Sequence, residues 1–79
     1  MRILYTLSTG TADATKATLP LHLAVNGSHV NGDDVAIVLA GDGTEYLGAG
    51  AIDAAHGVGL PPLAELFDKV RDYEIPVYV

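Results

Sequence analysis

Three short apolar segments, at residues 3–7, 35–40 and 74–79, alternate with longer segments of mixed character along this 79-residue chain. Short apolar runs that are bounded by glycine, proline and polar residues are typical of buried β-strands. The middle run, VAIVLA, shows no alternation between apolar and polar positions. A strand has this composition when helices cover both faces of its sheet, so we expect helical layers on both sides.

The clearest helical pattern lies near the end of the chain. Leu63, Leu66, Phe67 and Val70 recur at intervals of three and four residues, which predicts an amphipathic helix. The two prolines directly before it suit the first turn of a helix, where a missing N–H group costs nothing. Residues 45–55 are interrupted by glycines and predict a weak helix or an irregular connection.

Residues 12–25 form a second helical pattern, because Ala17, Leu21 and Ala24 fall on one stripe. Pro20 lies inside this pattern. Since proline removes one main-chain hydrogen bond, it should kink or divide the helix.

Both ends of this helix carry sequence signals. Thr11 or Asp13 can accept hydrogen bonds from the first main-chain N–H groups, and the Asn-Gly pair at 26–27 predicts the end of the helix.

The predicted order of elements along the chain is strand, helix, strand, weak segment, helix, strand. This alternation predicts an α/β fold with a parallel sheet of at least three strands, in a single domain over residues 1–79.

Composition narrows the possible partners. Hydrophobic residues make up 49% of the chain, which is more than so short a domain can easily bury, so we expect a homo-oligomer. The net charge of −6 argues against a nucleic-acid partner and against anionic membrane surfaces. No apolar stretch approaches the roughly 20 residues of a membrane span. With no signal-peptide pattern at its start, the chain is expected to be cytoplasmic.

Loops at the carboxyl ends of the strands are the candidate binding sites, because ligands of open parallel sheets bind there. Ser8, Thr9, Gly10 and Thr11 follow the first strand and lead into a helix N-terminus, whose amides can receive an anion. Turn formation and helix capping also account for these four residues without any ligand.

Two further positions and two histidines complete the candidate set. Asp42 and Gly43 follow the second strand, and the carboxylate of Asp42 could act in a site, although an aspartate between glycines often only shapes a turn. His22 lies in the first predicted helix and could be buried and hydrogen-bonded. His56 lies in a loop, where it could titrate near neutral pH.

Motifs of catalysis and cofactor binding are missing from the chain. The glycine fingerprint of dinucleotide-binding proteins, the phosphate-binding loop and the serine nucleophile elbow are all absent. The three histidines do not have metal-ligand spacing, and there is no cysteine. We therefore predict no metal, no cofactor and no catalytic residue, and leave open whether the protein is an enzyme.

Four segments in order resemble one protein family over essentially the whole chain. ILYTLSTG, KATLPLHLAVNG, DDVAIVLAGDG and HGVGLPPLAELFDKVRDYEIPVYV follow one another as in the DsrE/DsrF-like family. The resemblance implies a three-layer α/β/α fold that assembles as trimers or larger oligomers. Some members transfer sulfur inside the cell as a cysteine persulfide.

The resemblance also implies what this sequence lacks. In members that carry it, the cysteine stands directly after the strand that matches residues 75–79, and the sequence ends there, like the amino-terminal portion of such a domain. Because persulfide transfer needs a thiolate, we expect a DsrE-like protein of unassigned activity, with a sulfur-relay protein as partner. The alternative is a non-catalytic oligomeric module that binds a small anion or a partner protein at the strand ends. A flavodoxin-like nucleotide binder is a third alternative, by fold analogy alone.

Overall fold

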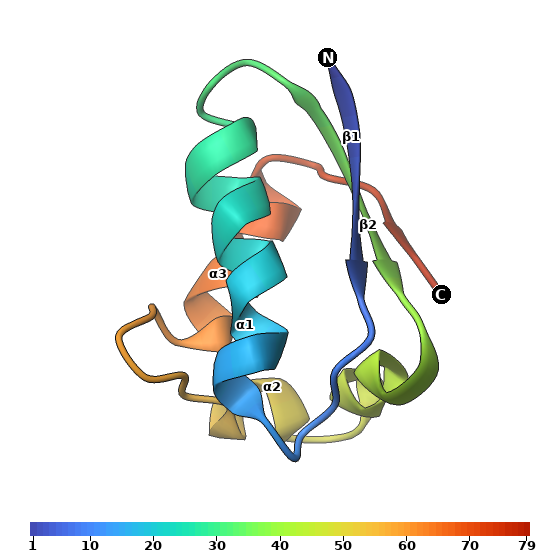
Figure 1. The fold of residues 1–79 in the computed structure, drawn as a ribbon, viewed down its shortest axis with the longest axis vertical. Helices are drawn as coiled ribbons and strands as arrows, with labels where there is room; N and C mark the ends of the chain where they lie inside the picture. Colours follow the sequence, from blue (N-terminus) through green and yellow to red (C-terminus); the bar gives the residue numbers. More distant parts are fainter.

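A computed structural model describes all 79 residues and shows an α/β protein with a three-stranded sheet (Figure 1). The strands are β1 (Arg2–Leu7), β2 (Asp34–Leu39) and β3 (Val77–Tyr78), in the order β1-β2-β3. β1 runs parallel to β2 over all six residues, whereas β3 runs parallel to β2 over two. The predicted parallel α/β fold is confirmed.

Helical segments connect the strands. After β1 come α1 (Ala14–Leu23) and a π-helical turn, η1 (Ala24–Ser28). After β2 come a 3-10 helix, η2 (Gly41–Leu47), the single turn α2 (Ala51–Ala54) and α3 (Leu63–Asp72). The weak segment is thus irregular, as predicted. None of these helices has the length and apolar character that crossing a bilayer requires.

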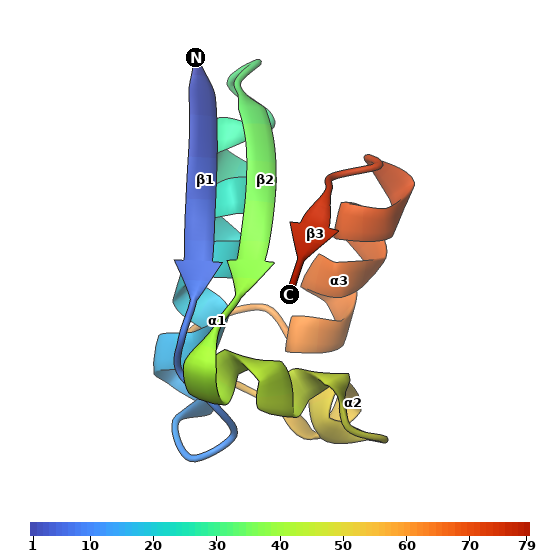
Figure 2. The same ribbon diagram turned by 90° about the vertical axis from the view of Figure 1, so that its right-hand side faces the viewer.

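Figures 1 and 2 show that the long helices α1 and α3 lie on one face of the sheet, whereas η2 and α2 lie beyond the carboxyl ends of β1 and β2. The strand order explains this arrangement, because both crossovers step in the same direction across the sheet. Right-handed crossovers that step the same way place their helices on the same side. The expected second helical layer is therefore not found, and the chain forms two layers, with the other face of the sheet open.

Burial along the strands follows from this one-sided cover. In β2, Val35, Ile37 and Leu39 are buried against the helices, whereas Ala36 and Val38 on the open face are only half-buried. The strand is apolar on both faces although helices cover one. This is the physical reason why the run VAIVLA suggested two helical layers.

The first helix begins as predicted and continues past its predicted interruption. The side chain of Asp13 accepts a hydrogen bond from the N–H group of Lys16 at 3.0 Å and caps α1. Pro20 lies inside α1 and does not divide it.

The Asn-Gly pair at 26–27 does not end the helix, contrary to the prediction. The chain widens here into the π-turn η1, in which the N–H group of His29 donates to the carbonyl oxygen of Ala24 at 2.9 Å. Lys69 on α3 donates to the side-chain oxygen of Asn26 at 2.9 Å. Asn26 therefore joins the two long helices instead of closing the first one.

Candidate functional site

The two predicted loops meet at the carboxyl ends of β1 and β2, at the bottom of Figure 2. Gly43 lies directly against the main-chain carbonyl oxygen of Leu7, and Gly10 lies against the carboxylate of Glu45 and the carbonyl oxygen of Asp42. Both glycines are buried, and a side chain at either position would overlap these atoms. Close packing between the loops is therefore what requires glycine at these positions.

Glu45 on η2 closes the loop that follows β1. Its Oε1 atom accepts hydrogen bonds from the main-chain N–H group of Thr11 at 2.8 Å and from the Thr11 hydroxyl at 3.1 Å. The donors that the sequence offered to an external anion thus bind a carboxylate of the same chain. Sequence reasoning missed Glu45, because it lies 34 positions from Thr11 and no local motif marks the pair.

Tyr46, the neighbour of Glu45, holds the same loop from the side of the core. Its side chain is buried, and its hydroxyl donates to the carbonyl oxygen of Gly10 at 3.0 Å. Burial raises the pKa of Tyr46 above its ordinary value, and the nearby carboxylates of Glu45 and Asp13 raise it further. The hydroxyl therefore keeps its proton, and the hydrogen bond, through the neutral range.

The remaining loop residues face solvent. Ser8, Thr11 and Asp42 are exposed, and Thr9 is half-buried. These residues do not line the hollow at the amino-terminal end of the sheet or the one between η2, α2 and α3. The hydrogen bonds of Glu45 and Tyr46 and the close packing at the two glycines join the loops into a closed edge of the sheet.

The two candidate histidines lie apart from these loops. His22 is half-buried near the far end of α1, where the side-chain amide of Asn26 lies 3.1 Å from its Nδ1 atom. His56 is exposed in the connection between α2 and α3, beside Gly57, which packs against the main chain of Thr15. No group of three histidine, cysteine or carboxylate side chains could hold a metal ion.

A hollow of about 720 Å³ lies at the opposite, amino-terminal end of the sheet. Leu4, Ala36 and Tyr78 line it from the open face of the sheet, and the turns before β2 and after α3 supply much of the remaining lining, including His29 and Tyr73. It exists because β3 is short: the chain leaves α3 and joins the sheet only at Val77, level with Ile37. Sequence reasoning did not identify this hollow, since it depends on the length of β3.

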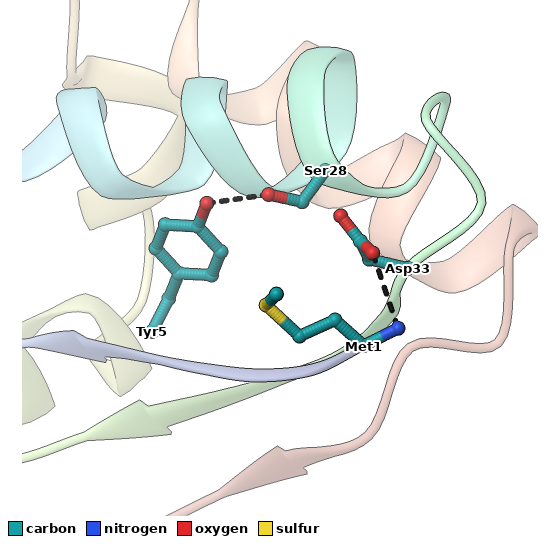
Figure 3. Close-up of polar contacts among 4 residues, drawn as sticks. All are labelled: Met1, Tyr5, Ser28 and Asp33. Carbon is teal, nitrogen blue, oxygen red and sulfur yellow. Dashed lines mark hydrogen bonds and ion pairs between the residues drawn. The ribbon is translucent and has the colours of Figure 1, made fainter.

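Figure 3 shows two polar contacts that β1 and the residue before it make with other parts of the chain. The hydroxyl of Tyr5 on β1 lies 2.6 Å from that of Ser28 in η1, and the amino group of Met1 lies 3.3 Å from the carboxylate of Asp33. The first contact joins β1 to the helical layer, and the second joins the start of the chain to the turn that precedes β2.

Comparison of the chain with known protein families, curated proteins and solved structures found no match. The fold itself defines the class: an α/β protein whose three parallel strands alternate with helices. Its surface offers a closed loop edge at one end of the sheet, and an open apolar face with a hollow at the other.

Proposed function

We propose that this chain is a non-catalytic, self-associating module of the DsrE-like kind, which works in the cytoplasm by binding proteins. The observation that supports this proposal best is the open face of the sheet. Leu4 and Tyr78 are 60% and 58% exposed there, and Ala36 and Val38 lie between them. Contiguous exposed apolar residues of this kind mark interaction surfaces.

The energetics of a small domain favour covering this face. Only 17 of the 79 residues are buried, so the core is small. Each Å² of apolar surface removed from water contributes about 25 cal/mol. A protein that covers the open face therefore removes its apolar surface from water and makes the folded chain more stable than it is alone.

Sulfur transfer enters the proposal through the family resemblance. The 79 residues of this chain include no cysteine, and a persulfide carrier needs a thiolate. The contribution of this chain is then to bind a sulfur-relay protein that holds the thiol, in an assembly of three copies or a multiple of three.

Two measurements test this function. Sedimentation velocity and native mass spectrometry at micromolar concentrations should give a mass above that of one chain, and a stable monomer would refute self-association. In a persulfide-loading assay with a thiol-bearing relay protein, mass spectrometry should find sulfur on that protein only. A sulfur adduct on this chain would refute the non-catalytic assignment.

A second candidate function is the binding of a small anion at the carboxyl ends of the strands. Thr11 already holds an anionic oxygen, that of Glu45, with two hydrogen bonds. In a Glu45→Ala variant these donors are free, so phosphate should raise the melting temperature more than it does in the wild type. Glu65→Ala, which removes one exposed carboxylate from α3, is the control. Equal phosphate effects in both variants would reject this candidate.

A further inference from the structure

We propose that the hollow at the amino-terminal end of the sheet binds the base of a nucleoside, and that the main chain of Val35 recognises the hydrogen-bonding edge of this base. The hollow has a volume of about 720 Å³, within the range of roughly 300–1,000 Å³ that is typical of small-molecule sites. Binding here does not require self-association, so this site and the proposed function can fail independently of each other.

The main chain of Val35 has an N–H group and a carbonyl oxygen that no other group of the chain binds. Successive residues of a central strand bond alternately to its two neighbours. In β2, the N–H group of Asp34 donates to the carbonyl oxygen of Met1, on the side of β1. The N–H group of Ile37 donates to the carbonyl oxygen of Pro76, on the side of β3. Val35, two residues before Ile37, therefore also directs its polar groups toward the side of β3.

Pro76 explains why the carbonyl oxygen of Val35 is unpaired. Ile37 lies opposite Val77, so Val35 lies opposite Ile75. In a regular parallel ladder, this oxygen would accept a hydrogen bond from the residue after Ile75. That residue is Pro76, which has no N–H group to donate. Figure 2 shows the chain before β3 leading away from β2 toward α3, and Val35, Ile75 and Pro76 all line the hollow.

The unpaired groups of Val35 match one edge of a nucleobase. Val35 is only 7% exposed, and buried main-chain groups nearly always have hydrogen-bond partners. A base presents a donor beside an acceptor: the N1 atom of adenine can accept from the N–H group of Val35, while its N6 amino group donates to the carbonyl oxygen. Proteins that bind a single base read this edge in the same way.

A peptide strand fits the same groups less well, because the unpaired stretch is one residue long. On one side of it, the N–H group of Asp33 already donates to the carbonyl oxygen of Ser28 at 3.0 Å. On the other side, the N–H group of Ile37 donates to Pro76 at 2.9 Å. Strand addition draws its affinity from several main-chain hydrogen bonds. A small molecule with one donor and one acceptor is therefore the better match.

A stacked pair of aromatic rings forms another part of the wall. The ring centroids of His29 and Tyr73 lie 4.1 Å apart, with 14° between the ring planes, and both residues line the hollow. His29 follows η1 and Tyr73 follows α3, so the ends of two helices bring the rings together. Unpaired bases bind proteins by stacking on aromatic side chains. The hollow thus combines a planar surface with a hydrogen-bonding edge.

Charges around the hollow favour a nucleoside over a nucleotide. Asp33, Asp34 and Glu74 line it, whereas Arg2 is the only arginine or lysine that does. Glu74 has a φ of 56°, in the left-handed region where glycine is usual after a helix, so this carboxylate is held there at a cost in backbone energy. A phosphate group would add negative charge beside these carboxylates, and Coulomb repulsion opposes its binding.

Titration with adenosine and with its 5′-monophosphate tests the site in the wild-type chain. Calorimetry should give a Kd on the order of 0.1 mM for adenosine, as expected for a ligand of this size. The monophosphate should bind roughly threefold or more weakly at low ionic strength. In NMR spectra, adenosine should shift the amide signal of Val35 and leave that of Thr11, in the loop at the opposite end of the sheet, unchanged.

Matched variants test the two walls of the hollow. Pro76→Ala supplies an N–H group for the carbonyl oxygen of Val35, so β3 should lengthen, and adenosine should bind at least tenfold more weakly with no loss of melting temperature. Pro62→Ala, at an exposed proline before α3, is the control and should bind like the wild type. Tyr73→Ala should also weaken binding, whereas Tyr73→Phe keeps the stacked ring and should retain it.

The outcomes distinguish the base from other ligands. N-acetylvaline methylamide offers a peptide donor and acceptor without a planar ring, so tighter binding of this probe than of adenosine would overturn the assignment in favour of a peptide. No binding of adenosine, guanosine, cytidine or uridine at millimolar concentration would overturn the site, as would shifts at Thr11 without shifts at Val35. Equal affinities for adenosine in Pro76→Ala and Pro62→Ala would overturn the role of Val35.

Discussion

The hydroxyl of Tyr5 lies 2.6 Å from the hydroxyl of Ser28, across 23 positions of the sequence (Figure 3). Tyr5 belongs to β1, and Ser28 is the last residue of η1, so the bond joins the sheet to the end of the first helix. The π-turn continues the helix through the Asn-Gly pair to Ser28, one residue further on, and Ser28 there reaches the strand. A helix that ended at the Asn-Gly pair would not present this hydroxyl in the same way.

This bond predicts energetic coupling between the two positions. Tyr5→Phe and Ser28→Ala should each lower the free energy of unfolding by about 1 kcal/mol. Each substitution removes the hydrogen bond and leaves the other half-buried hydroxyl without its partner. The double variant should lose much less than the sum, since the same bond is removed twice. Urea unfolding measures all three. Ser8→Ala, at an exposed serine, is the control and should change little, and strict additivity would refute the coupling.

A substitution at Gly43 tests the close contact between the loop after β2 and the end of β1. In Gly43→Ala the new methyl group would overlap the carbonyl oxygen of Leu7, which is main chain and cannot swing away. Overpacking of this kind typically costs about 1–3 kcal/mol, and the melting temperature should fall accordingly. The matched control is Gly27→Ala, because Gly27 lies in η1 with open space around it. There alanine should be neutral or stabilising, since it favours helical backbone. Equal effects at both positions would contradict the packing argument.

Tyr46 predicts a loss of stability in alkaline solution. Its pKa is raised in the folded chain, first by burial and then by the charges of Glu45 and Asp13. A group whose pKa is raised on folding stabilises the fold below its unfolded pKa, about 10 for tyrosine, and this contribution is lost as pH rises through the folded pKa. The urea midpoint of the wild type should therefore fall from about pH 10 upward.

The Tyr46→Phe variant separates this effect from general alkaline unfolding. Phenylalanine cannot donate to the carbonyl oxygen of Gly10, so the variant should be less stable at neutral pH by about 1 kcal/mol. Its urea midpoint should then decline less steeply above about pH 10 than that of the wild type. An equally steep decline would show that ionisation of Tyr46 is not responsible.

The elements that sequence predicts well are those with local causes. The spacing of Leu63, Leu66 and Val70 predicted α3, and all three are buried. The capping role offered to Asp13 depends on neighbours three positions away, and it was confirmed. The alternation of strands and helices predicted the parallel sheet, because short connections of this kind allow few other topologies.

What sequence could not predict depends on contacts between distant segments. The run VAIVLA is apolar on both faces, so its composition could not reveal that one face is open. Glu45 and Thr11 are 34 positions apart, and no local sequence motif predicts the hydrogen bond between them. The hollow depends on where β3 joins the sheet, which is a property of the whole crossover and not of one segment.

Burial of one side of α3 in the core predicts a large difference between two leucines. Leu66 is fully buried, whereas Leu23 on α1 is 49% exposed. Leu66→Ala should lower the free energy of unfolding by about 2–5 kcal/mol, through lost apolar burial and the cavity left behind. Leu23→Ala should stay within about 0.5 kcal/mol of the wild type. If Leu66→Ala unfolds the chain outright, Val70→Ala removes a smaller buried group from the same helix and should give a measurable, partial loss. Similar losses for Leu66 and Leu23 in urea unfolding would mean that α3 does not bury Leu66 in the core.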